Sequence, residues 1–110
     1  MNIQVRAKDI TLSEHSKLHI DTAIGQFSKY NLDITTTNVV IEKAKKAVNV
    51  EFDIHIAHNS PIVINQTDDD LDTAIDLAID RANKALRRLH DKITSHRGSG
   101  IKEIELVEEA

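Results

Sequence analysis

The chain has 110 residues, which is enough for one domain and too few for two. The absence of cysteine excludes disulfide frameworks, zinc–cysteine sites and thiol catalysis. The formal net charge is −4, yet residues 81–97 carry six Lys and Arg residues against the single acid Asp91. The first residues do not form a signal peptide, and no apolar run approaches the ~20 residues that cross a bilayer. We therefore expect a cytoplasmic protein without a membrane partner.

A strand and a helix are predicted in the first third of the chain. Residues 2–8 alternate between apolar and polar side chains, which is typical of a half-buried strand. A helix is expected to begin near Ser13, whose hydroxyl can cap the free amides of the first turn. The apolar positions of this helix recur at intervals of three and four and are Ile20, Ala23, Ile24, Phe27 and Tyr30. Asn31 is the predicted stop.

Three strands and a long helix are predicted in the rest of the chain. Residues 36–44 and 48–57 are expected to form strands, joined by a hairpin with its tip at 45–47. A turn at 58–61 then leads into a short fourth strand at 62–65. A sustained helical period predicts a helix from about 69 to 95, followed by two glycines.

The resulting order, β-α-β-β-β-α, predicts an α+β fold with a four-stranded mixed sheet. The crossover helix should make the first strand parallel to a neighbour, and the other strands should form an antiparallel meander. Alternating strands indicate a sheet with one covered face, so both helices should pack on the same side. We expect residues 1–97 to be the folded domain and 98–110 to be an acidic flexible tail or the start of a linker.

The basic residues of the long helix are the main functional candidates. At 100° per residue, four of them fall within a ~80° arc that spans ~16 Å along the axis: Arg81, Lys84, Arg88 and Lys92. We call these four residues the basic stripe. Such a stripe could follow several phosphates, although positive charge near a helix C-terminus also favours the helix dipole. The chain has only three aromatic residues, so phosphates and shape, not stacking on aromatic rings, should carry any RNA contact.

Two further clusters are weaker candidates. His15 and His19 are four residues apart on a helix, a spacing that would let both bind one metal ion. The sequence offers no third ligand. The run Asp68–Asp70 could hold a cation or serve a hydrolase, but acids at a helix start more simply cap free amides. His90 and His96 are expected to extend the basic face. We therefore expect no cofactor, no metal and no enzymatic activity.

The long helix resembles that of the ribosome hibernation family, also called the sigma-54 modulation protein family. This family comprises the hibernation-promoting factor and its paralogue, the ribosome-associated inhibitor. The matching positions are Asp70-Leu-Asp-Thr-Ala-Ile-Asp76, Ile79-Asp-Arg81, Lys84, Leu86, Arg88, Asp91, Lys92 and His96. Ser13-Glu14, Phe27 and Tyr30 of the first helix also match, and so does the order of elements. The fold that this implies is similar to that of double-stranded-RNA-binding domains.

The resemblance implies a non-enzymatic protein that binds the small ribosomal subunit in the channel used by mRNA and by the A- and P-site tRNAs. Contacts to ribosomal RNA phosphates would block translation in stationary phase or stress. The implied RNA contacts are the basic stripe and, on the first helix, Lys17; no small-molecule substrate is implied. Arg87 is added here from its charge and position alone.

Departures from the family pattern leave alternatives open. Asp72 stands where the family usually has Tyr, while Ala23 and Gln26 stand where relatives often have Lys. The acidic segment 104–109 is similar to the tail of the ribosome-associated inhibitor, which favours a monomer off the ribosome. The chain could instead be the N-terminal domain of a long, ribosome-dimerising factor. A protein-interaction module that uses the open sheet face is a further alternative.

Overall fold

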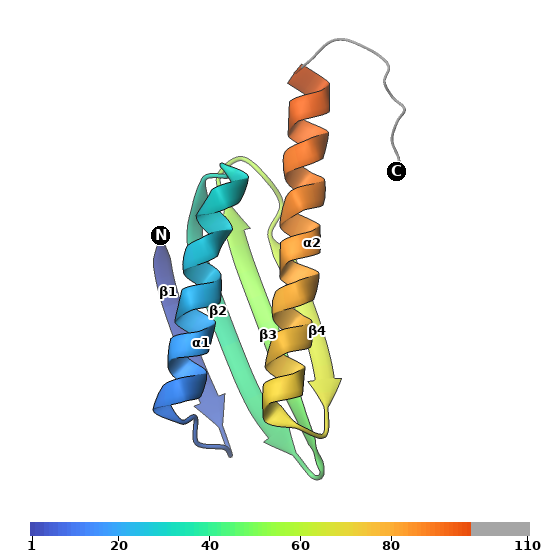
Figure 1. Cartoon of the computed structure of the whole chain (residues 1–110). Helices are drawn as coiled ribbons and strands as arrows, with labels where there is room; N and C mark the ends of the chain where they lie inside the picture. Colours follow the sequence, from blue (N-terminus) through green and yellow to red (C-terminus); the bar gives the residue numbers. More distant parts are fainter. Residues whose placement is uncertain (98–110) are drawn as a thin grey trace.

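The computed structural model describes residues 1–97, and the predicted tail at 98–110 lies outside this range. The elements are β1 (Asn2–Lys8), α1 (Glu14–Gly25), a short 3₁₀ helix η1 (Gln26–Tyr30), β2 (Ile34–Ala44), β3 (Ala47–Ile56), β4 (Ile62–Asp68) and α2 (Leu71–Arg97). They form one four-stranded sheet in the order β1-β2-β3-β4, with β1 parallel to β2 and the other pairs antiparallel. Both helices lie on the same face of the sheet (Figure 1). The predicted α+β fold and its element order are confirmed.

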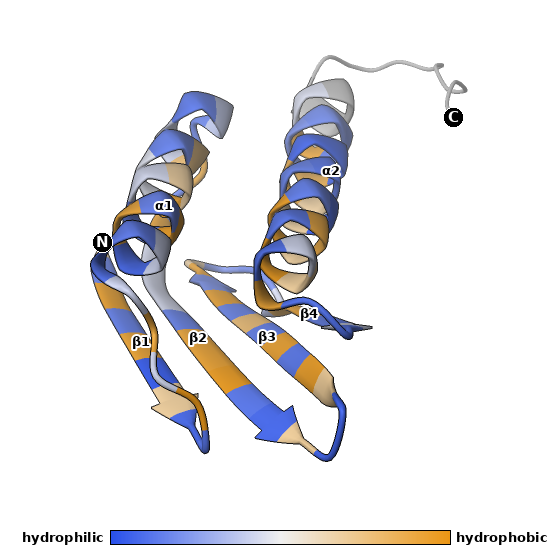
Figure 2. Ribbon diagram, turned by 60° about the horizontal axis from the view of Figure 1, so that its bottom comes forward, coloured by the Kyte–Doolittle hydropathy of each residue, from blue (hydrophilic) through white to orange (hydrophobic). Residues whose placement is uncertain are grey.

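The core lies between the two central strands and the two helices. The side chains of β3 alternate between buried and partly exposed along its whole length, so one face of this strand is covered. Phe27 from η1 and Phe52 from β3 are fully buried, with ring centroids 6.5 Å apart. Figure 2 shows the same alternation as bands on β3, with the apolar sides of both helices turned toward the sheet. Burial of these side chains is the main favourable contribution to folding.

Local signals in the sequence place the helix ends. The Ser13 hydroxyl accepts a hydrogen bond from the Ser16 amide at 3.1 Å, which confirms the predicted cap of α1. Asn31 adopts a left-handed conformation with φ 55°, so the predicted stop is also confirmed. The last turn before it is η1, which the helical spacing did not distinguish from α-helix. The long helix begins two residues later than predicted, because Asp68, Asp69 and Asp70 form the turn before it.

The prediction of a half-buried β1 is wrong. Ile3 is 36% exposed, Ala7 is exposed, and Val5 alone is partly covered. The physical reason is the strand order, since β1 is an edge strand and the fully buried apolar side chains of the sheet lie on β2 and β3. The predicted fourth strand was too short, because residues 66–68 also pair with β3 in the antiparallel register.

Candidate nucleic-acid interface

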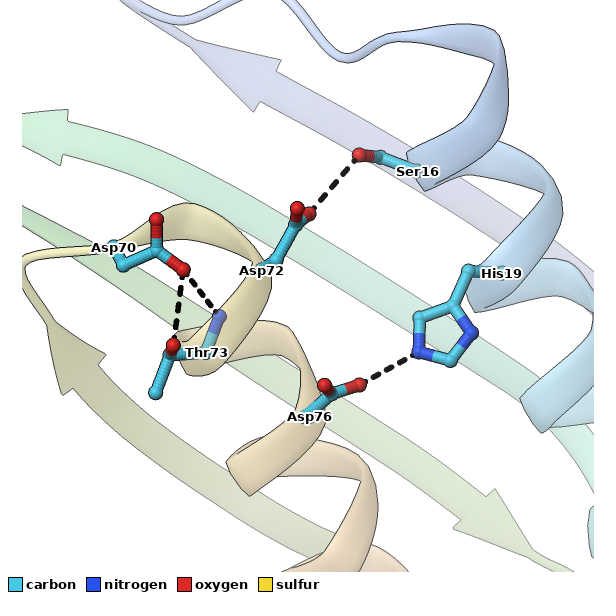
Figure 3. Close-up of polar contacts among 6 residues, drawn as sticks. All are labelled: Ser16, His19, Asp70, Asp72, Thr73 and Asp76. Atoms are coloured by element: carbon cyan, nitrogen blue, oxygen red, sulfur yellow. Dashed lines mark hydrogen bonds and ion pairs between the residues drawn. The ribbon is translucent and has the colours of Figure 1, made fainter.

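Acidic side chains at the start of α2 are used within the protein itself. The Asp70 carboxylate accepts hydrogen bonds from the Thr73 amide at 3.0 Å and the Thr73 hydroxyl at 2.9 Å (Figure 3). These bonds stabilise the charged form, so they lower the pKa of Asp70. Asp68 in turn accepts from the Asp70 amide. The aspartate run therefore caps the helix, as its position predicted.

The flank of α2 that faces α1 is acidic. The Ser16 hydroxyl donates to Asp72 at 3.4 Å, and His19 Nε2 lies 2.7 Å from Asp76 Oδ1. Figure 3 shows both contacts crossing the space between the helices. His19, considered above as a possible metal ligand together with His15, is thus turned toward a carboxylate of the neighbouring helix. The seam between the helices places two carboxylates where a phosphate would be repelled.

The basic stripe lies on the opposite flank of α2, beside the sheet edge. Its first member, Arg81, donates to the backbone carbonyl of Asn65 at 3.0 Å and to the side-chain oxygen of Gln66 at 3.2 Å. Both partners belong to β4, the edge strand farthest from β1. These bonds orient the guanidinium of an exposed side chain. Sequence reasoning missed Asn65 and Gln66, because a contact between strand and helix leaves no local signal in the sequence.

The rest of the stripe points to solvent. Lys84 is paired with Asp80 at 3.2 Å, an exposed contact between neighbouring turns that contributes little to stability. Arg88 and Lys92 are exposed and form no ion pair with any residue whose side chain the structure describes. Their charges are therefore free to bind an external anion. Arg87 is exposed as well, but it lies 100° around the axis from Arg88, outside the arc of the stripe.

The predicted contact Lys17 and the lysines of the hairpin tip both lie away from the stripe. Lys17 lines a hollow of about 500 Å³ with Val5 and Ala7 of β1, so it lies at the opposite edge of the sheet. Lys45 and Lys46 form the tip of the β2–β3 hairpin, at the end of the molecule where α2 begins (Figure 1). The compact candidate interface is therefore one flank of α2 rather than a surface shared by both helices.

The expectation that His90 extends the basic face is wrong. His90 is partly buried and lines a hollow with residues from the turns before β2 and before β4. Helix geometry explains the difference, because His90 is 160° from Lys92 around the axis, taking 100° per residue. His96 lies outside the range in which side chains are described.

Comparisons with known proteins identify the family and the fold. Residues 3–94 match the family described as sigma 54 modulation protein / S30EA ribosomal protein. No curated protein sequence matches the chain at a significant level. The crystal structure of the Thermus thermophilus Protein Y N-terminal domain is similar, with a TM-score of 0.71, 22% identity, and 81% of this chain and 99% of that chain covered.

A second solved structure has the same fold, and the described helices add one observation. A ribosomal subunit interface protein from Coxiella burnetii gives a TM-score of 0.74 with 15% identity, covering 83% of this chain and 99% of that chain. At this level of identity the two solved structures support the fold alone. Within residues 1–97, neither helix is long and apolar enough to cross a membrane.

Proposed function

We propose that this chain, which belongs to the sigma 54 modulation protein / S30EA ribosomal protein family, is a ribosome hibernation factor. It binds the small ribosomal subunit in the channel used by mRNA and by the A- and P-site tRNAs. Occupying that channel blocks translation in stationary phase or under stress. The function is binding in the cytoplasm, and no chemical step is needed for it.

The one-sided basic stripe is the observation that carries this proposal. A protein of net charge −4 presents Arg81, Lys84, Arg88 and Lys92 on one flank of one helix, while its carboxylates Asp72 and Asp76 face the other helix. The local field, rather than the net charge, directs the approach of a polyanion. Ribosomal RNA supplies such a polyanion as a fixed array of phosphates.

The two kinds of cation in the stripe serve different purposes. Arg81 is held by β4, so its guanidinium is positioned before RNA arrives. A preorganised side chain loses less conformational freedom on binding, and the planar guanidinium can contact a phosphate through two N–H groups. Arg88 and Lys92 are unrestrained and can adapt to the phosphate spacing. We include Arg87 and Lys17 as secondary contacts, because each lies off the stripe.

Sedimentation with purified ribosomal subunits tests the proposed target. We expect the chain to travel with the small subunit and with single ribosomes, and to be displaced by mRNA and tRNA that fill the channel. Binding to the large subunit alone, or no displacement, would contradict the proposed site. A peak of paired ribosomes would support the alternative of a dimerising factor.

Nuclease treatment separates RNA binding from the alternative of a protein-interaction module. If phosphate contacts dominate, digestion of exposed ribosomal RNA should release the chain. A complex that survives digestion would favour binding to a ribosomal protein through the open sheet face.

A further inference from the structure

A hollow of about 430 Å³ lies against the C-terminal part of α2, on the side of the helix turned away from the basic stripe. It is bounded by the turn between η1 and β2, the turn between β3 and β4, and the last turns of α2. Figure 1 shows these two turns at the same end of the sheet, where α2 continues beyond the strands. The volume is within the usual range for small-ligand sites.

The walls of the hollow are apolar and its rim is polar. Leu32, Ile56 and Ile93 supply aliphatic surface, and each is partly or fully buried. The rim carries the amide of Asn31, the imidazole of His58 and the exposed carboxylate of Asp33. Flat apolar walls with a few polar groups are what a planar heterocycle requires, since its faces are apolar and its edges carry donors and acceptors.

Two rim side chains are available to a ligand. Asn31 and His58 are exposed and form no side-chain hydrogen bond with any residue whose side chain the structure describes. Both also have a left-handed backbone, with φ of 55° and 65°. Asn and His adopt this conformation more readily than most other residues, so both positions suit their backbone as well as leaving a polar side chain at the rim.

The hollow is connected to the basic stripe through Arg87. Arg87 precedes Thr94, which lines the hollow, by seven residues and thus differs from it by about 20° around the axis. It also directly precedes Arg88 of the stripe. Arg87 therefore lies between the stripe and the hollow on the solvent side of α2, together with the carboxylate of Asp91. An RNA strand that contacts both the stripe and the hollow would pass around this side of the helix, with one phosphate on Arg87.

We propose that the hollow binds one unpaired nucleobase of the RNA whose phosphates lie on the basic stripe. The proposal rests on the proposed function and adds to it a contact that reads a base rather than a phosphate. The base would lie between Leu32, Ile56 and Ile93, with the imidazoles of His58 and His90 available for stacking and Asn31 for hydrogen bonds to its edge. This contact would favour single-stranded or splayed RNA over a regular duplex.

Two matched RNAs test the proposal with the full chain. One is a ten-nucleotide single strand of mixed sequence, and the other is the same ribose-phosphate chain without bases. Their phosphates are equal in number, so they differ only in the presence of bases, and the variant described next assigns the difference to the hollow. We expect the intact strand to bind roughly five- to a hundred-fold more tightly, the range given by one stacked base. Its binding should shift the amide resonances of residues 31–33, 57–59 and 90–94.

A double variant identifies the hollow as the source of that preference. His58→Gly preserves the left-handed turn and His90→Ala is compatible with a helix, so the fold should survive and can be checked by circular dichroism. The variant should bind both RNAs with the affinity that the wild type shows for the abasic strand. His15→Ala, which removes an exposed imidazole from α1, should leave the preference unchanged.

Each outcome either supports the proposal or overturns it. Equal affinity for the two RNAs, or a preference that survives in the double variant, overturns the base site while leaving phosphate binding intact. Failure of both RNAs to bind at low salt overturns it as well. Failure of the proposed function is seen separately, as ribosome binding that does not depend on the basic stripe.

Discussion

The two halves of α2 have opposite charge and opposite surroundings. The start of the helix and the residue before it carry aspartates, and four of them have partners within the protein. Asp70 caps the helix, Asp72 contacts Ser16, Asp76 contacts His19, and Asp80 pairs with Lys84. The second half carries the cations, and Arg88 and Lys92 have no ion-pair partner among the described side chains. The aspartates at the start of α2 therefore stabilise the fold, whereas Arg88 and Lys92 on the same helix are exposed to solvent.

This difference separates charge that organises the structure from charge that is available for binding. The first half of α2 covers the sheet, where Ile75 is fully buried, whereas the second half extends past the strands, where Ile93 is only partly covered (Figure 1). A projecting helix can enter a groove that the body of the domain cannot. Arg88 and Lys92 are therefore placed where little of the fold depends on their side chains, whereas Arg81 also contacts β4.

The largest expected effect comes from truncating the same residue type in each half. Ile75→Ala should lower the free energy of unfolding by about 2–5 kcal/mol, because it opens a cavity in a fully buried site. Ile93→Ala should cost roughly 1 kcal/mol or less, because that side chain is already partly exposed. Urea denaturation of both variants measures the difference. Equal losses would show that the two halves are equally well anchored.

The salt dependence of ribosome binding should report the number of phosphates held. About four to six contacts predict a slope of roughly −3 to −5 for the logarithm of affinity against the logarithm of salt concentration. Binding measured between low and physiological salt gives this slope. A slope near zero would exclude phosphate contacts as the source of affinity.

Arg81 and Arg88 should behave differently although both belong to the basic stripe. Arg88→Ala should weaken RNA binding and leave stability within about 0.5 kcal/mol, because the side chain is exposed and has no ion-pair partner among the side chains described up to residue 94. Arg81→Ala should weaken binding and also reduce stability slightly more, because it removes two hydrogen bonds to β4. Arg81→Lys keeps the charge without the guanidinium geometry, so it should restore binding only in part. Thermal denaturation beside a binding titration separates the two effects.

The smallest expected effect is the pH dependence of the Asp70 cap. Its pKa is lowered in the folded state from the ordinary value of 3.8 by the hydrogen bonds from Thr73. The stabilisation by this charge is therefore complete above that ordinary value and is lost as the pH falls through the lower folded-state pKa. Asp70→Asn should melt at a slightly lower temperature than the wild type at pH 7, and the gap should close as the pH falls below the lowered folded-state pKa of Asp70. Asp69→Asn, at an exposed neighbour, is the control, and a gap that persists in acid would contradict the assignment.

Periodicity predicted most of the fold, because the elements follow local patterns. The alternation in β3 and the helical spacing in α2 each describe a face that tertiary packing then covers. The exposure of β1 could not be predicted, since it depends on the strand order and not on the strand's own sequence. The basic stripe could be predicted because four side chains of one helix define it. The hydrogen bond from Arg81 to Asn65 and the place of His90 in the hollow could not be predicted, because both depend on how separate elements pack together.

The most direct test of the central claim makes the same charge reversal at two different sites on the protein. Lys84, Arg88 and Lys92 would be replaced by Glu in one variant, and the hairpin lysines Lys43, Lys45 and Lys46 in the other. Each variant changes the charge by the same amount at exposed positions, and circular dichroism confirms the fold of both. Sedimentation with ribosomes should then show that the first variant no longer binds while the second travels with the small subunit as the wild type does. Equal loss in both variants, or binding by both, would contradict the assignment of the interface to α2.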